Sequence, residues 1–192
     1  MNIDFLRKNC VADPVIHGLG IIKLYMKGGY HYNFHSKIIN NPSKSPHNHG
    51  RDFTSKCLFG KIKNIIYSYK EVPKSDWYLA EAYLPTTNNL LDITYDKKEP
   101  SMIYENIEPI IDSEEIQNKG DIINHYHKNI HDTEVLSKHA CTRIINKSDF
   151  NEAPLIIQNK NIKRVSPYEN RGLSEDNWET INKILKEQND EI

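Results

Sequence analysis

The chain of 192 residues is long enough for one medium domain with its own hydrophobic core, and no second domain is required. Its 25 lysine and arginine residues nearly balance 26 acidic residues, for a formal charge of −1, so composition provides no general attraction to nucleic acid or to an anionic membrane. A small-molecule partner is therefore expected, with no nucleic acid and no membrane.

Cysteine usage and hydropathy indicate the compartment. The three cysteines, Cys10, Cys57 and Cys141, are widely spaced and form no C-x-x-C pattern, which argues against a disulfide framework and against a cysteine zinc site. No segment reaches the roughly 18 apolar residues that span a bilayer, and the first residues do not resemble a signal peptide. These features predict a soluble, cytoplasmic protein.

Residues 1–18 are predicted to form an arm or a short helix, and a β-hairpin follows it. Apolar residues alternate with polar ones on both sides of the Gly28-Gly29 turn, which predicts two strands with one buried face. The alternating apolar residues are Ile22, Leu24, Met26, Tyr30, Tyr32 and Phe34. This pattern places His31 and His35 on the opposite, wetter face of the hairpin.

Further strands are predicted at residues 55–59 and 61–69, joined near Gly60. Residues 75–119 are expected to be an insertion with a strand near Trp77, Tyr78, Tyr83 and Leu84, and with polar, break-prone stretches that include residues 112–119. Strands follow at 121–126, 140–145 and 155–157, and an amphipathic helix begins near Ser174. Many short strands, with helices only near the ends, predict an all-β barrel or sandwich.

Two histidines, His47 and His49, make up the pattern most suggestive of chemistry. In extended backbone, residues i and i+2 point to the same side, so a third imidazole from a neighbouring strand would complete a three-nitrogen metal site with open positions. His125 and His127 form a second such pair, but their polar surroundings are typical of loop or solvent-facing histidines. Spacing alone therefore discriminates little between these pairs.

The residues around the first pair resemble the cupin superfamily, small jelly-roll barrels whose two sequence motifs contribute metal ligands. The first family pattern, G-x5-H-x-H-x(3,4)-E-x6-G, is matched by His47, His49 and Gly60. Phe53 stands in the glutamate position.

The second family pattern, G-x5-P-x-G-x2-H-x3-N, is matched by Gly120 and His131, while Tyr126, Lys128 and Val135 stand where the family has Pro, Gly and Asn. The resemblance covers residues 19–147. It implies a cupin barrel at 19–150 and a C-terminal extension at 151–192.

The resemblance implies that His47, His49 and His131 bind one metal ion. A site of three histidines is similar to that of the cysteine dioxygenase-like branch, in which ferrous iron binds a substrate and dioxygen. Ferrous iron is therefore the expected cofactor. Nickel, zinc and copper are alternatives because imidazole suits them too, and manganese is a further alternative. The expected function is a metal-dependent cupin oxygenase that acts on a small molecule with dioxygen, and edge-strand pairing by resemblance suggests a homodimer.

The chain also departs from that branch. No arginine lies between Arg7 and Arg51 to hold a substrate carboxylate, and Cys57 follows the second histidine by eight residues, later than in the branch. Cysteine is therefore not the predicted substrate. Two other functions stay open, namely a cupin that binds a metal or metabolite without turnover and a metal-dependent lyase or isomerase.

Three further residues are candidates for catalysis. Tyr32 and Tyr126 are proposed to donate hydrogen bonds to substrate or oxygen, and Arg143 is proposed to clamp a carboxylate. The ordinary alternative is that the tyrosines pack in the core and the arginine lies at a solvated edge. Asp52 is a fourth ligand only if a bulge turns it toward the histidines.

Overall fold

The computed structural model describes residues 1–17, 20–37, 39, 45–81, 101–147, 153–162 and 174–190. Two helices, α1 (Ile3–Asn9) and α2 (Ser174–Asp190), lie near the ends of the chain. The strands are β1 (Val15–His17), β2 (Ile21–Met26), β3 (Tyr30–Ser36), β4 (Phe53–Phe59), β5 (Lys61–Glu71), β6 (Trp77–Glu81), β7 (Ser101–Asn118), β8 (Ile122–His125), β9 (Ile130–Val135), β10 (His139–Asn146) and β11 (Leu155–Asn159).

The strands form two antiparallel sheets. Sheet A has the order β1-β2-β3-β10-β4-β8, and sheet B has the order β11-β6-β7-β5-β9. The predicted class, mostly β with helices only near the ends, is confirmed, and the curled sheets are consistent with a barrel or sandwich. The jelly-roll assignment stays a prediction.

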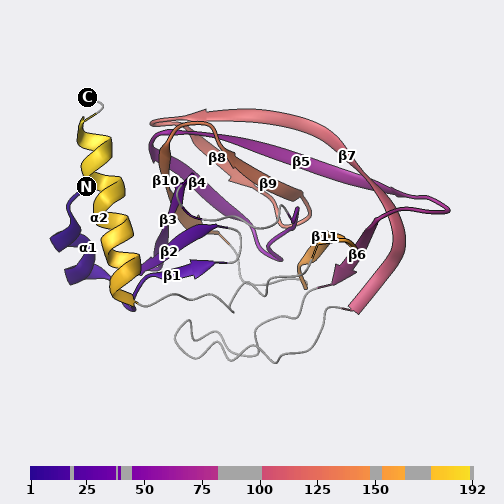
Figure 1. Cartoon of the computed structure of the whole chain (residues 1–192), viewed down its shortest axis with the longest axis horizontal. Coiled ribbons are helices and arrows are strands. Elements are labelled where there is room, and N and C mark those ends of the chain that lie inside the picture. Colours follow the sequence, from indigo (N-terminus) through magenta and orange to yellow (C-terminus); the bar gives the residue numbers. More distant parts are fainter. Residues whose placement is uncertain are drawn as a thin grey trace.

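Both helices cover the outer face of sheet A at one end of the molecule (Figure 1). Helix α2 presents an apolar stripe at helical spacing, as the sequence predicted, and this stripe packs on the buried side chains of the β2–β3 hairpin. Its residues are Trp178, Ile181, Ile184 and Leu185. An ion pair of 2.8 Å between Arg7 of α1 and Glu175 of α2 joins the two helices.

The opposite face of sheet A is also covered, because sheet B packs against it. His35 alternates with the helix-facing residues of β3 and is only 4% exposed. The predicted wet environment for His35 is therefore wrong. A hairpin with a single buried face was expected from its alternation, whereas a strand in the middle of a sandwich has two covered faces.

Sheet B closes on itself through the segment around His47. His47 forms antiparallel bridges with His131 in β9 and with Ile156 in β11, the two edge strands of this sheet. The backbone N–H of His47 donates to the carbonyl of His131 over 2.9 Å, and the N–H of Ile157 donates to the carbonyl of Pro46 over 2.8 Å. A second apolar core, containing Leu79, Ile107, Ile130 and Ile157, packs within this curled sheet.

The region 75–119 contains more regular structure than the sequence predicted. Strand β7 runs for 18 residues without a break and pairs along β5, so the expected interruption at residues 112–119 is wrong. The polar residues of that stretch face solvent on a paired strand, except for Gln117, which is buried and donates to the carbonyls of Ser55 and Asp121. Tyr83 and Leu84 lie outside the described residues.

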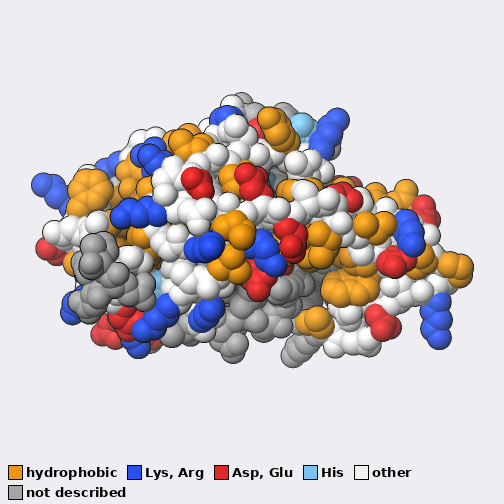
Figure 2. Space-filling model, turned by 90° about the horizontal axis from the view of Figure 1, so that it is seen from above, with side chains coloured by type: hydrophobic (Ala, Val, Ile, Leu, Met, Phe, Trp, Pro, Cys, Tyr) orange, Lys and Arg blue, Asp and Glu red, His pale blue; other side chains and the backbone are white. Residues whose placement is uncertain are grey.

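The surface carries charges of both signs. On the face shown in Figure 2, lysine and arginine side chains are interspersed with acidic and apolar ones. Among the described helices, none combines the length and the apolar character that crossing a membrane requires.

Candidate metal centre

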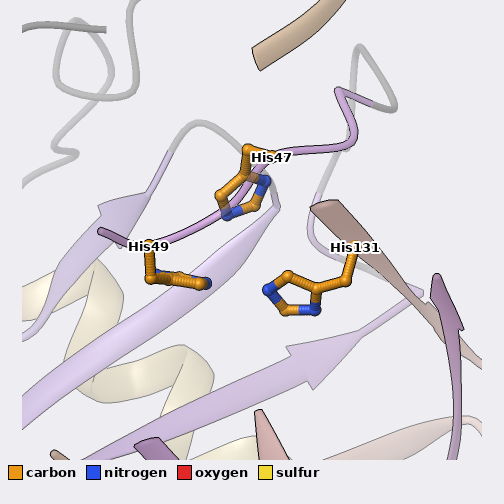
Figure 3. A group of neighbouring side chains, drawn as sticks. All are labelled: His47, His49 and His131. Atoms are coloured by element: carbon orange, nitrogen blue, oxygen red, sulfur yellow. The ribbon is translucent and has the colours of Figure 1, made fainter. Parts of the chain in front are cut away.

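His47, His49 and His131 converge between the two sheets (Figure 3). One ligand nitrogen from each ring lies within 4.8 Å of the others. The ring centroids are 4.8 Å apart for His47 and His49, 5.4 Å for His47 and His131, and 5.0 Å for His49 and His131. The structure thus brings together the three residues that the motif spacing selected.

The backbone bridge between His47 and His131 sets this geometry. In an antiparallel pair, directly opposed residues place their side chains on the same face, so the bridge holds both imidazoles on the side of sheet B that faces sheet A. His49, two residues further along, joins them. The Nδ1–H of His47 donates to the carbonyl of Ser45 over 3.0 Å, which leaves its Nε2 as the acceptor nitrogen, as in metal-binding histidines.

The imidazole ring of His131 is buried without a hydrogen-bond partner among the described residues. It is 6% exposed, and neither Nδ1 nor Nε2 has a partner among the described residues. Buried polar atoms are nearly always satisfied, and an unsatisfied one costs about 1–3 kcal/mol. A cation bound by this ring would satisfy the unpaired nitrogen lone pair.

Burial keeps the imidazoles of the cluster neutral. It lowers the pKa of His47 to about 4 and is the largest cause of the low pKa values of His49 and His131, which lie well below the usual range. Lys23 lowers the pKa of all three rings further. Because a neutral imidazole is the form that binds a metal, the three rings are in the ligand state at neutral pH.

The donor set fits a transition metal with little rearrangement. Nitrogen ligands at 2.0–2.1 Å from a tetrahedral ion lie roughly 3.4 Å apart, so the nitrogens of His47, His49 and His131 need to close by no more than about 1.5 Å. Side-chain rotation supplies such a movement. Three histidines without a carboxylate suit iron, copper, nickel and zinc.

Phe53 and His125 form a wall beside the three histidines. The two rings stack with centroids 4.5 Å apart and an interplanar angle of 8°, and they lie opposite each other in the β4–β8 register. His125 is 5% exposed, and its ring lies 4.8 Å from that of His131. The expectation that His125 faces solvent is therefore wrong, because pairing of β8 with β4 turns it inward.

Two predicted catalytic residues lie on the other face of sheet A. Tyr32 packs in the core beneath the helices, and Arg143, its partner in the β3–β10 register, lies over the ring of Tyr30 at 5.8 Å. The structure does not bring Tyr32 or Arg143 to the histidines, because both belong to the helix-facing set of their strands. The side chain of Tyr126 is 60% exposed in the turn after β8.

Asp52 is directed to His127 and not to the histidine cluster. Its Oδ1 accepts hydrogen bonds from the backbone N–H of His127 over 2.7 Å and from its Nδ1 over 2.9 Å. His127, which lowers the pKa of Asp52, thus has a structural partner. Among the described residues, neither belongs to the group of possible metal ligands.

The sequence interpretation did not single out Lys23, which acts on the cluster, or Arg51, which acts on Lys23. The charge of Lys23 in β2 lowers the pKa of His31, His35 and the three candidate ligands, and Arg51 lowers those of Lys23 and His31. A signal for Lys23 was available, since it alternates with Ile22 and Leu24 as His31 and His35 alternate with Phe34.

A surface hollow of about 480 Å³ lies elsewhere, on α2, and is lined by Glu179, Asn182, Lys183, Lys186 and Glu187. Its lining in the described part of the chain comes from α2 and includes no histidine. It has no evident connection to the metal centre.

Comparison with known proteins leaves the family open. No family model matches the chain, and no curated protein matches it. A similar solved structure is the crystal structure of Drosophila melanogaster CENP-C bound to CAL1, with a TM-score of 0.39 and 10% identity over 76% of this chain and 92% of that one. A likeness this weak carries no argument. A β-sandwich with a group of three histidines is compatible with the cupin superfamily.

Proposed function

We propose that the chain is a metal-dependent enzyme of cupin type, an oxygenase that holds ferrous iron on His47, His49 and His131 and acts on a small molecule. The observation that carries the proposal is the buried ring of His131, which has no hydrogen-bond partner among the described residues and meets two further imidazoles. A purely structural histidine cluster would leave this polar group unsatisfied at a cost in stability.

The ligand set favours chemistry over simple structural binding. Structural zinc sites usually close the coordination shell with four protein ligands, whereas catalytic sites keep positions open. When bound, ferrous iron would supply open positions for a substrate and dioxygen and would activate dioxygen as the oxidant. Phe53, in the place of a ligating glutamate, leaves one such position without a protein donor.

The protein residues position the ligands and restrict water. The carbonyl of Ser45 orients His47, and the backbone bridge orients His47 and His131 together. The stacked rings of Phe53 and His125 cover the side of His131 that faces sheet A. These contacts hold the three nitrogens in one arrangement and limit the access of solvent to them.

Metal content tests the ligand assignment. The wild-type protein, reconstituted anaerobically with ferrous iron, is expected to retain a stoichiometric ion on elemental analysis, and His131→Ala is expected to lose it. His127→Ala is the matched control, because that histidine lies four residues away and outside the cluster. Full occupancy in a folded His131→Ala variant would contradict the site.

Oxygen uptake tests the reaction class. The iron-loaded wild type is expected to consume dioxygen with a member of a panel of small molecules, and His131→Ala is expected not to. Turnover of the same molecule without dioxygen would contradict the oxygenase proposal and indicate a lyase or isomerase. Metal binding without turnover of any compound in the panel would contradict the oxygenase proposal and indicate a protein that only binds the metal.

A further inference from the structure

Lys23 places a positive charge on the interior face of sheet A. Its neighbours Ile22 and Leu24 are fully buried in the core beneath the helices, so alternation along β2 turns Lys23 to the opposite face, toward sheet B. In the β2–β3 register it lies opposite Asn33, which alternates with the helix-facing residues of β3 in the same way.

This charge lies next to the metal centre. Lys23 acts on His47, His49 and His131 strongly enough to lower the pKa of each ring. Burial, and then the nearby Arg51, lowers the pKa of Lys23 itself to about 8, so the ammonium form still predominates at neutral pH. Lys23, with Arg51 near it, thus places positive charge beside the three imidazoles.

No acidic group in the described part of the chain balances Lys23. The salt bridges among these residues do not include it, and no carboxylate contributes to the shift of its pKa. Asp52, the acidic residue next to Arg51, bonds to His127. A divalent ion on three neutral imidazoles adds two further positive charges. Partly buried charge of one sign is unfavourable without a counter-charge, so this site requires an anion.

Asn33 adds a second requirement. Its Oδ1 is buried and has no hydrogen-bond partner among the described residues, although the side chain faces the same interior as Lys23. A buried acceptor of this kind is normally satisfied. A ligand with a hydroxyl or amine group near its anionic group would supply the missing donor.

We propose that the substrate of this centre is a small hydroxy- or amino-carboxylate, whose carboxylate binds Lys23 beside Arg51 and whose hydroxyl or amine donates to Asn33. The inference deepens the proposed function and rests on it for the neighbouring metal. A carboxylate is favoured over a phosphate because phosphate sites combine several backbone N–H donors, often at a helix N-terminus. The groups that interact with Lys23 here are neutral imidazoles and Arg51, and neither described helix begins at the site.

Binding of matched acids and amides tests the charge requirement without any variant. Calorimetry on the iron-loaded protein under anaerobic conditions would compare glycolate, lactate and glycine with glycolamide, lactamide and glycinamide, and also with acetate and inorganic phosphate. We expect each acid to bind at least tenfold more tightly than its amide, and glycolate more tightly than acetate. Equal affinity for acids and amides, or tighter binding of phosphate than of every carboxylate, would overturn the inference.

Variants assign the preference to Lys23. Lys23→Gln is expected to lower the affinity for the acids at least tenfold, whereas Lys23→Arg keeps the preference for acids over amides. Lys56→Gln is the matched control, because Lys56 lies in the same sheet opposite Arg143 on the helix-facing side. Unchanged affinity in Lys23→Gln, with cooperative urea unfolding showing that the variant is folded, would contradict the assignment.

Repeating the measurement on metal-free protein separates this inference from the proposed function. Carboxylate binding that depends on Lys23 in a chain that fails to bind metal would support the anion site and contradict the metalloenzyme. A chain that binds iron but does not distinguish acids from amides would contradict the anion site alone.

Discussion

The buried histidines make the stability of the metal-free protein sensitive to mild acid. His35 and His125 are 4% and 5% exposed, and burial lowers the pKa of each to about 4, with Lys23 a further cause for His35. An unfolded histidine has a pKa near 6.5, so unfolding takes up protons between about pH 6.5 and pH 4. The contribution of these histidines to the free energy of unfolding is therefore fully present above about pH 6.5 and decreases as the pH falls below that value.

Proton linkage sets the size of this effect. At pH 5.5 the unfolded histidine is about ten-elevenths protonated while the folded one is nearly neutral, which corresponds to about RT ln 11, or between about 1 and 2 kcal/mol per residue. His35 and His125 together therefore account for about 3 kcal/mol of lost stability between pH 7.5 and pH 5.5. Other buried histidines add to this loss.

The loss of stability is measured by urea unfolding at pH 7.5, 6.5 and 5.5, with a metal chelator present and tryptophan fluorescence as the signal. His35→Gln and His125→Gln are each expected to remove about 1–2 kcal/mol of it. Ser55→Ala is the control, because it removes a buried hydroxyl at every pH without removing a titrating group. A wild-type protein that loses less than about 1 kcal/mol, or two glutamine variants that keep the entire loss, would refute the reasoning.

Three other substitutions test the packing of the fold, each by chemical denaturation. Gly60→Ala is expected to destabilise the fold far more than Gly29→Ala, because a Cβ at Gly60 meets the backbone of His139 and one at Gly29 meets nothing within 4 Å. The two glycines have nearly the same φ (+76° and +77°), so backbone strain is matched between the variants. Equal losses of stability in the two variants would contradict this prediction. Glu187→Gln is expected to weaken the attachment of α2, since Glu187 accepts a hydrogen bond from His139 over 2.7 Å. This hydrogen bond lowers the pKa of Glu187 to about 2, so its contribution to stability is present above about pH 4.5 and disappears as the pH falls toward 2. A variant and a wild type that lose stability in parallel between pH 4.5 and pH 2 would contradict this prediction. Trp178→Ala should cost about 3–5 kcal/mol because the ring is 3% exposed, and a loss below about 1 kcal/mol would show that α2 is not integral to the core.

The sequence was most informative where a pattern reports a local geometry. Alternation predicted the β2–β3 hairpin, helical spacing predicted α2, and the distances from His47 to His49 and from Gly120 to His131 predicted the three rings that converge. Each of these patterns depends on residues close together in the chain.

What the sequence did not predict depends on strand pairing. The polar surroundings of His125 indicated solvent, but its register with Phe53 turns it inward. The side of Arg143 depends on its pairing with Tyr32, a residue already expected on the buried face of the hairpin. Long-range register is not encoded in the alternation of either strand alone.

The bridges made by His47 have a consequence for the order of events during synthesis. The segment that carries His47 is held on one side by β9 and on the other by β11, and both strands follow it in the chain. The nascent chain therefore cannot form both backbone bridges around the three histidines until β11 has emerged. A chain truncated before residue 155 would keep the bridge from His47 to β9 and lose the bridge to β11.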